Sequence, residues 1–123
     1  MKKILLSLLV LAGVHAHADW QPFAKAEDGD WYVDTQTLQN GARPRLWTLF
    51  DHHKPVGDFG VLSSKALHEF DCEQKRMREI NILVYNDHMA RGSMLRNTSP
   101  GTQMMHPPPG SVFEQLMTLA CKP

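Results

Sequence analysis

The fold is decided by the stretch SSKALHEFDC at residues 63–72, which a short polar turn connects to MREINILVY at residues 77–85. Two strand-forming runs on either side of a polar break predict an antiparallel hairpin. Side chains alternate between the two faces of a strand. The set that contains Phe70 and Cys72 is the better core face, because these two residue types favour burial. His68 belongs to the same set and is expected to be half-buried.

The register of this hairpin stays open at the level of sequence. A two-residue turn at positions 74–75 would pair Asp71 with Arg78 on the outer face. A turn one residue longer or shorter would place the isoleucines of the second strand on the Cys72 face instead. The choice matters because a one-residue slip moves every side chain of a strand to the other face.

Further strand-like runs surround the hairpin, and a helix follows it. The expected strands cover residues 19–24, 31–33, 45–51 and 89–96, with a turn at 35–38 and a loop at 52–60. Ser111, with Glu114 three residues later, forms a capping box, and apolar residues at helical spacing follow it. Strands first and a helix last predict an α+β domain. We expect an antiparallel sheet of five to six strands with a C-terminal helix packed on it.

The N-terminus has the pattern of a secretory signal peptide. Lys2 and Lys3 precede an apolar run at residues 4–14, and Ala16-His17-Ala18 forms a small-x-small cleavage site. The apolar run is too short to span a membrane, which takes about 20 residues. No cysteine lies near the cleavage site, so neither a lipid anchor nor a transmembrane segment is expected. The sequence predicts a signal peptide at 1–18 and one domain at 19–123, periplasmic or secreted.

The two cysteines, Cys72 and Cys121, are predicted to form a disulfide. An exported chain with two cysteines most often pairs them. The spacing is not that of a C-x-x-C redox or metal motif. Such a bond would tie the middle of the sheet to the last helix.

Charge and motif content exclude several function classes. Without Lys2 and Lys3, 11 basic residues face 13 acidic ones, a formal charge of −2. This balance offers no electrostatic footprint for nucleic acid. The sequence has no G-x-S-x-G elbow and no phosphate-binding glycine loop. We therefore expect a non-enzymatic protein without a cofactor.

Two weaker signals point to binding. His52, His53 and His106, with nearby methionines, suggest a periplasmic metal- or small-ligand-binding protein as the alternative function. Adjacent residues of a strand point apart, however, and the zinc-site spacings are missing, so a solvated loop is the favoured interpretation. Aromatic residues are concentrated in the N-terminal strands, where most should be core. Any of them that is exposed could anchor a protein partner. The aromatic residues in question are Trp20, Trp31, Tyr32 and Trp47.

The order of motifs along the chain resembles the surface-adhesin protein E family of Gram-negative bacteria. The motifs that carry the resemblance are Trp20, WYVD at 31–34, LWTLFD at 46–51, SSK at 63–65, EFDC at 69–72, Arg76, Arg78, PGS at 109–111, Glu114 and AC at 120–121. Only Cys72 and Cys121 can be carried over residue by residue.

The resemblance implies an adhesin-like function in addition to the α+β fold with its disulfide. The expected partners are host extracellular-matrix proteins such as vitronectin and laminin, or another cell-envelope protein, and such a domain can form a homodimer. The sequence departs from the family pattern at two places. It lacks the lipobox cysteine, and residues 104–106 stand where many members carry a tryptophan before the last helix.

Overall fold

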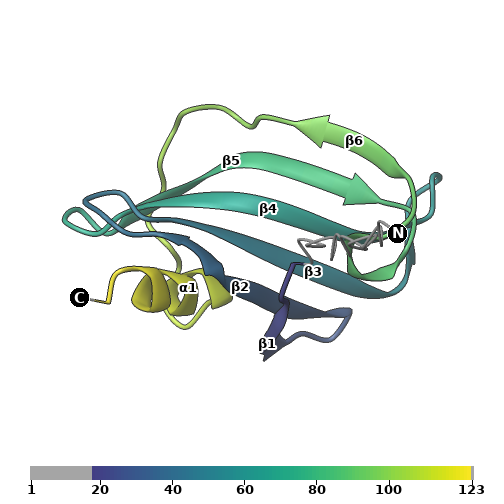
Figure 1. Cartoon of the computed structure of the whole chain (residues 1–123), viewed down its shortest axis with the longest axis horizontal. Coiled ribbons are helices and arrows are strands. Elements are labelled where there is room, and N and C mark those ends of the chain that lie inside the picture. The colour runs from purple at the N-terminus through teal and green to yellow at the C-terminus, as the bar shows by residue number, and fades with distance from the viewer. Residues whose placement is uncertain (1–17, 123) are drawn as a thin grey trace, which may run out of the picture.

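The computed structural model describes residues 18–122, so the predicted signal peptide lies outside the described residues apart from Ala18. Six antiparallel strands form one sheet in the order β1-β2-β3-β4-β5-β6, each beside its neighbour in sequence (Figure 1). A single α-helix, α1, follows them. The predicted α+β fold is confirmed. The bounds are β1 Gln21–Lys25, β2 Gly29–Gln39, β3 Arg45–Val56, β4 Val61–Asp71, β5 Arg76–Tyr85, the 3-10 turn η1 His88–Ala90, β6 Met94–Thr98 and α1 Val112–Ala120.

The hairpin of β4 and β5 begins in a register that places opposite charges face to face. Asp71 pairs with Arg76, and Glu69 pairs with Arg78. The pairing of Asp71 with Arg78 is therefore wrong by two positions, because the turn spans residues 72–75 instead of two residues. The two-residue turn nevertheless predicted the correct side of the sheet, because the arginines of β5 do lie opposite the carboxylates of β4 on the outer face.

A β-bulge then changes the side on which β5 presents its residues. His68 pairs with Glu79, whereas Leu67 pairs with Asn81, so Ile80 is the additional residue. Beyond the bulge, Ile82 lies opposite Ala66, on the face that also carries His68. Both alternatives left open by the sequence therefore occur, one on each side of the bulge.

Two strands are longer than predicted, because the expected turn and loop are extended backbone. β3 continues through residues 52–56, and β2 continues through residues 35–39. In β2 the ladder is irregular between Asp34 and Gln39. There the Asp34 carboxylate accepts a hydrogen bond from the Gln36 N–H (3.1 Å), and the Thr37 hydroxyl donates to the Asp34 carbonyl (2.6 Å). Such local side-chain bonds distort a strand, and here the strand resumes after them.

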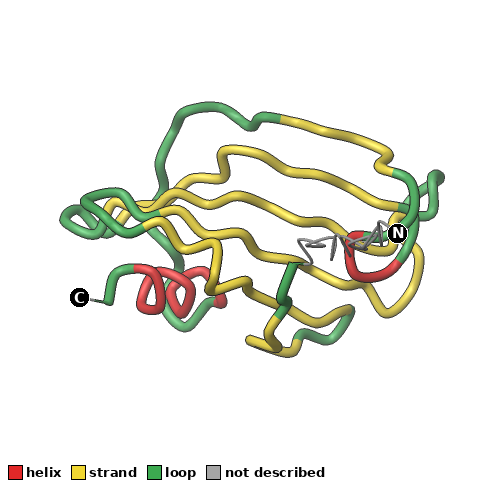
Figure 2. The backbone as a smooth tube through the Cα atoms, viewed as in Figure 1, coloured by secondary structure: helices red, strands yellow, loops and turns green. Residues whose placement is uncertain are grey.

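The sixth strand is shorter than predicted and starts at Met94. Residues 86–93 form a turn that includes η1, in which the Asp87 carboxylate accepts from the His88 N–H (2.7 Å). A long loop then runs from β6 to α1 (Figure 2). Its backbone pairs with the sheet at an isolated bridge, where Met105 and Met77 exchange two backbone hydrogen bonds of 2.8 Å.

The core lies between α1 and one face of the sheet. Leu116, Met117 and Ala120 of the helix pack with one apolar residue from each of four strands, β2 to β5; these residues are Val33, Leu46, Phe70 and Met77. The predicted cap is present, because the Ser111 hydroxyl accepts from the Glu114 N–H at 3.3 Å. The reciprocal bond goes from the Gly110 N–H to the Glu114 carboxylate, also at 3.3 Å.

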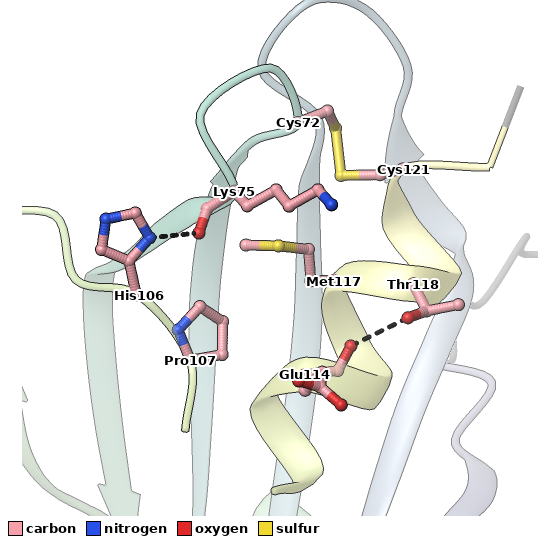
Figure 3. A pocket seen from close by; sticks show the side chains of 8 residues that line it. All are labelled: Cys72, Lys75, His106, Pro107, Glu114, Met117, Thr118 and Cys121. Carbon is pink, nitrogen blue, oxygen red and sulfur yellow. Dashed lines mark hydrogen bonds between the residues drawn. A yellow bond between two sulfur atoms is a disulfide. The ribbon is translucent and has the colours of Figure 1, made fainter. Parts of the chain in front are cut away.

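The predicted disulfide joins Cys72 to Cys121 and fixes the end of α1 to the β4–β5 turn (Figure 3). The two Cα atoms are 5.6 Å apart, and the residues are separated by 49 positions in sequence. The bond therefore fastens the helix to the end of β4, one of the two middle strands of the sheet.

Candidate binding surface

The face of the sheet opposite α1, called here the outer face, carries the partly exposed aromatic and basic side chains. On β3 it presents Arg45 and Trp47, because the alternate residue Leu46 belongs to the core. On β4 the same alternation places Lys65 and Glu69 there, with Glu69 opposite Arg45. Within residues 18–122, no α-helix covers this face.

An aromatic group surrounds Lys65 near the middle of the outer face. The Lys65 Nζ lies 5.3 Å from the ring centroid of Trp47 and 5.9 Å from that of Tyr85. These distances allow a cation–π interaction with both rings. Trp20 joins Trp47 and Lys65 in lining a cavity of about 400 Å³. All four predicted candidate anchors are partly exposed, and Trp20 and Trp47 are the two that line this cavity.

Four arginines surround two carboxylates at the Cys72 end of this face. They form the arginine cluster: Arg43, Arg45, Arg76 and Arg78 around Glu69 and Asp71. Arg45 binds the Glu69 carboxylate through Nε (3.0 Å) and Nη2 (2.9 Å). Arg78 binds its other oxygen through Nε (3.1 Å) and Nη2 (3.0 Å). Such two-point contacts fix the guanidinium planes.

The carboxylates of the cluster are ionised by their surroundings. Burial alone would raise the pKa of Glu69, but hydrogen bonds and charge attraction from Arg45 and Arg78 outweigh it and lower the pKa below its ordinary value. The pKa of Asp71 is lowered by the Gln74 N–H, against desolvation, with help from Arg76. Four positive charges against two negative ones leave an excess of two positive charges at the surface.

Replacing Glu69 by glutamine is expected to lower the free energy of unfolding by about 2 kcal/mol, because a neutral amide cannot hold two guanidinium groups. A glutamine at the exposed Glu73 should change it by less than about 0.5 kcal/mol. Because the pKa of Glu69 is depressed in the folded state, its carboxylate stabilises the fold at pH values above the ordinary carboxyl range, and this stabilisation is lost as the pH falls from that range through the depressed pKa. Urea unfolding at several acidic pH values should therefore show a flatter profile for Glu69→Gln. An unchanged profile would contradict this role.

His68 differs from its prediction, since it is fully buried and not half-buried. Its Nε2 lies 2.7 Å from the Thr48 hydroxyl, and its ring stacks beside Phe70 at 6.1 Å between centroids. Burial lowers the pKa of His68 to about 4. The imidazole is therefore neutral at pH 7 and part of the core.

The three histidines of the metal-binding alternative do not come together. His52 lies in the second half of β3, where its ring meets Phe50, and His53 beside it pairs with Asp30 at 3.5 Å. His106 lies at the other end of the sheet, where its Nδ1 is 3.0 Å from the Lys75 carbonyl. Within residues 18–122, no three metal-ligating side chains converge.

His106 instead lines a cavity of about 500 Å³ beside the disulfide. Figure 3 shows the Lys75 side chain lying across this cavity above Met117, with Glu114 and Thr118 of α1 on its far side. The polar groups here are largely occupied by local bonds, such as the one from the Thr118 hydroxyl to the Glu114 carbonyl (3.1 Å). This cavity is therefore a weaker candidate site than the outer face.

Half of the arginine cluster can be predicted from the sequence. The carboxylates Glu69 and Asp71 lie close in sequence to Arg76 and Arg78 across a short turn, a pattern typical of a salt-bridged sheet surface. The prediction missed Arg45 at the start of β3 and Arg43 in the segment just before that strand. The alternation that puts Arg45 on the same side as Trp47 was the available signal.

Comparison with known proteins agrees with this description. Two solved structures of Haemophilus influenzae protein E share the fold. Crystal form II has a TM-score of 0.64 at 10% identity and covers 87% of this chain and 90% of that one. Protein E from non-typeable Haemophilus influenzae has a TM-score of 0.59 at 9% identity and covers 88% and 78%, respectively. No curated protein matches the chain by sequence.

Two further findings complete the comparison. In the part of the chain that the structure describes, no helix has the length and apolar character needed to cross a membrane. The family model described as surface-adhesin protein E matches residues 20–122, which is nearly the whole predicted domain. The chain therefore belongs to the surface-adhesin protein E family.

Proposed function

We propose that this chain is a non-enzymatic, exported domain that binds another protein through the outer face of its sheet, in the manner of an adhesin. Membership of the surface-adhesin protein E family supports the adhesin-like role. The partner class that fits best is a host extracellular-matrix protein, with another cell-envelope protein as the second choice.

The observation that carries this proposal is the gathering of tryptophan and arginine on one face. Trp47 lies between the Lys65 ammonium group and the arginine cluster, since Trp47 and Arg45 are alternate residues of one strand. Tryptophan, tyrosine and arginine are the residue types that most often dominate the binding energy of protein interfaces. Arg45 and Arg78 are already fixed by Glu69, so less side-chain freedom is lost when a partner binds.

The test measures binding of the mature domain, residues 19–123, to immobilised matrix proteins, including vitronectin and laminin, at physiological salt. Replacing Trp47 by alanine is expected to weaken binding by at least about tenfold, because a central aromatic anchor is lost. Alanine at the exposed Thr118, on the opposite side of the sheet, is the matched control and should leave affinity unchanged. Thermal unfolding of each variant checks that it is folded.

Two outcomes would contradict the proposal. One is that the wild-type domain binds neither matrix proteins nor proteins of the cell envelope. The other is that Trp47→Ala and Thr118→Ala bind equally well, which would place the interface elsewhere on the molecule.

A further inference from the structure

A second cavity lies on the α1 side of the sheet, beside β5. Ile82 pairs with Thr98 of β6, and the next contact along β5 is the pair of Met77 and Met105. Between these two points, the chain after β6 swings away from β5 as a loop (Figure 2). A cavity of about 350 Å³ fills this interval. That volume lies at the lower end of the range for small-molecule sites.

The walls of this cavity are mainly apolar, with one carboxylate among them. Met77, Met105 and Phe113 supply thioether and aromatic surface, and Pro100 adds to it. More than half of Met105 is exposed, although it is apolar. Glu79 is the acidic residue in the lining, which also includes Arg78, Gly101 and Gln103. The Arg78 guanidinium is bound to Glu69 on the outer face. We call this cavity the Glu79 pocket.

In the part of the chain that the structure describes, the Glu79 carboxylate has no counter-ion. Its neighbour Arg78 points to the outer face, where two of its nitrogens hold Glu69 at 3.1 and 3.0 Å. Its cross-strand partner is His68, which is buried and neutral. The ion pairs within residues 18–122 do not include Glu79.

The surroundings of Glu79 penalise its negative charge. Desolvation raises the pKa of Glu79 above its ordinary value, and it is the sole cause of that shift. A partly dehydrated carboxylate without a partner is stabilised by any cation that reaches it. A metal ion is a poor fit, because hard cations take six or more oxygen ligands, whereas this lining offers one carboxylate and one amide among thioether, aromatic and guanidinium groups.

We propose that the Glu79 pocket binds an organic cation, with an ammonium or guanidinium group at the Glu79 carboxylate and an apolar body against Met77, Met105 and Phe113. The apolar walls bind the body through burial, and the carboxylate selects the charge. This site is independent of the proposed protein-binding surface, since Glu79 lies opposite His68 on the α1 side of the sheet.

The test uses benzylamine, with benzyl alcohol as a neutral probe of the same shape. Each is titrated into the disulfide-bonded mature domain at pH 7 and low salt, and backbone amide shifts are followed by NMR. Benzylamine should bind at least about fivefold more tightly, as expected for a partly desolvated ion pair. The largest shifts should lie at Met77, Glu79, Met105 and Phe113. Equal affinity for the two probes, or shifts centred elsewhere, would overturn the proposal.

Two variants separate the charge of Glu79 from general electrostatics. Glu79→Gln keeps the shape of the side chain and should remove the preference for benzylamine. Glu27→Gln removes an exposed carboxylate of β1–β2 and should keep the preference. As a readout that needs no variant, the Glu79 carboxyl can be titrated by ¹³C NMR, and its pKa should fall when benzylamine is present. The proposal would be contradicted if the preference for benzylamine remained in Glu79→Gln, or if benzylamine did not change the pKa of Glu79.

Discussion

Replacing Cys72 and Cys121 together by serine is expected to lower the free energy of unfolding by about 4 kcal/mol. The bond closes a loop of 49 positions, and the chain-entropy model gives about this value for such a loop. A domain of this size has a total stability of about 5–15 kcal/mol, so the loss is a large share. Urea unfolding of the mature domain measures it directly.

The same experiment has an internal control. Reducing the wild-type domain should cost about as much as the double substitution, whereas the serine variant should not respond to reductant. A loss below about 1 kcal/mol in both cases would contradict the prediction. It would mean that α1 stays docked through its packing alone.

Replacing Leu116 by alanine is expected to lower the free energy of unfolding by about 3–4 kcal/mol. Leu116 is fully buried, and it lies in the core cluster with Phe70 and Leu46. Truncation of such a leucine loses its burial and leaves a cavity. A helix of nine residues is not stable alone in water, so this contact is central to its docking.

The matched control for this prediction is Thr118→Ala, two residues away on the exposed side of α1. It should change stability by less than about 0.5 kcal/mol. Combining Leu116→Ala with the loss of the disulfide should cost less than the two effects added, because both act on the same docked helix. Strict additivity would show that the bond and the leucine stabilise separate parts of the domain.

Local sequence patterns predicted which strands and helix form, but they did not predict the lengths of these elements. The β4–β5 hairpin, the core side of β4 and the capped helix each follow from residues a few positions apart, such as Ser111 and Glu114. The continuation of β2 past Asp34 could not be predicted, because polar residues such as these usually end a strand. Here the side-chain bonds of Asp34 and Thr37 accompany a shift in register, and the strand continues to Gln39. The burial of His68 depends on how α1 is docked, which β4 alone does not specify.

The binding surface was predictable in part for the same reason. Arg78 and Glu69 are joined by one hairpin, so their proximity follows from a short loop. Arg45 reaches the same cluster from a different strand, through the pairing of β3 with β4, and Arg43 reaches it from the segment just before β3. The Glu79 pocket could not be predicted from the sequence. One of its walls comes from residues 100–105, which have no periodic pattern.

The bulge at Ile80 reverses the alternation of β5, so that different residues face each side of the sheet before and after it. Before the bulge, β5 contributes Arg78 to the outer face and Glu79 to the α1 side. After it, Ile82 takes the α1 side, opposite Ala66. Without the additional residue, Ile82 would follow Arg76 and Arg78 onto the outer face. The one-residue shift therefore keeps the arginines of the first half of β5 outside and brings the isoleucine of its second half to the apolar side.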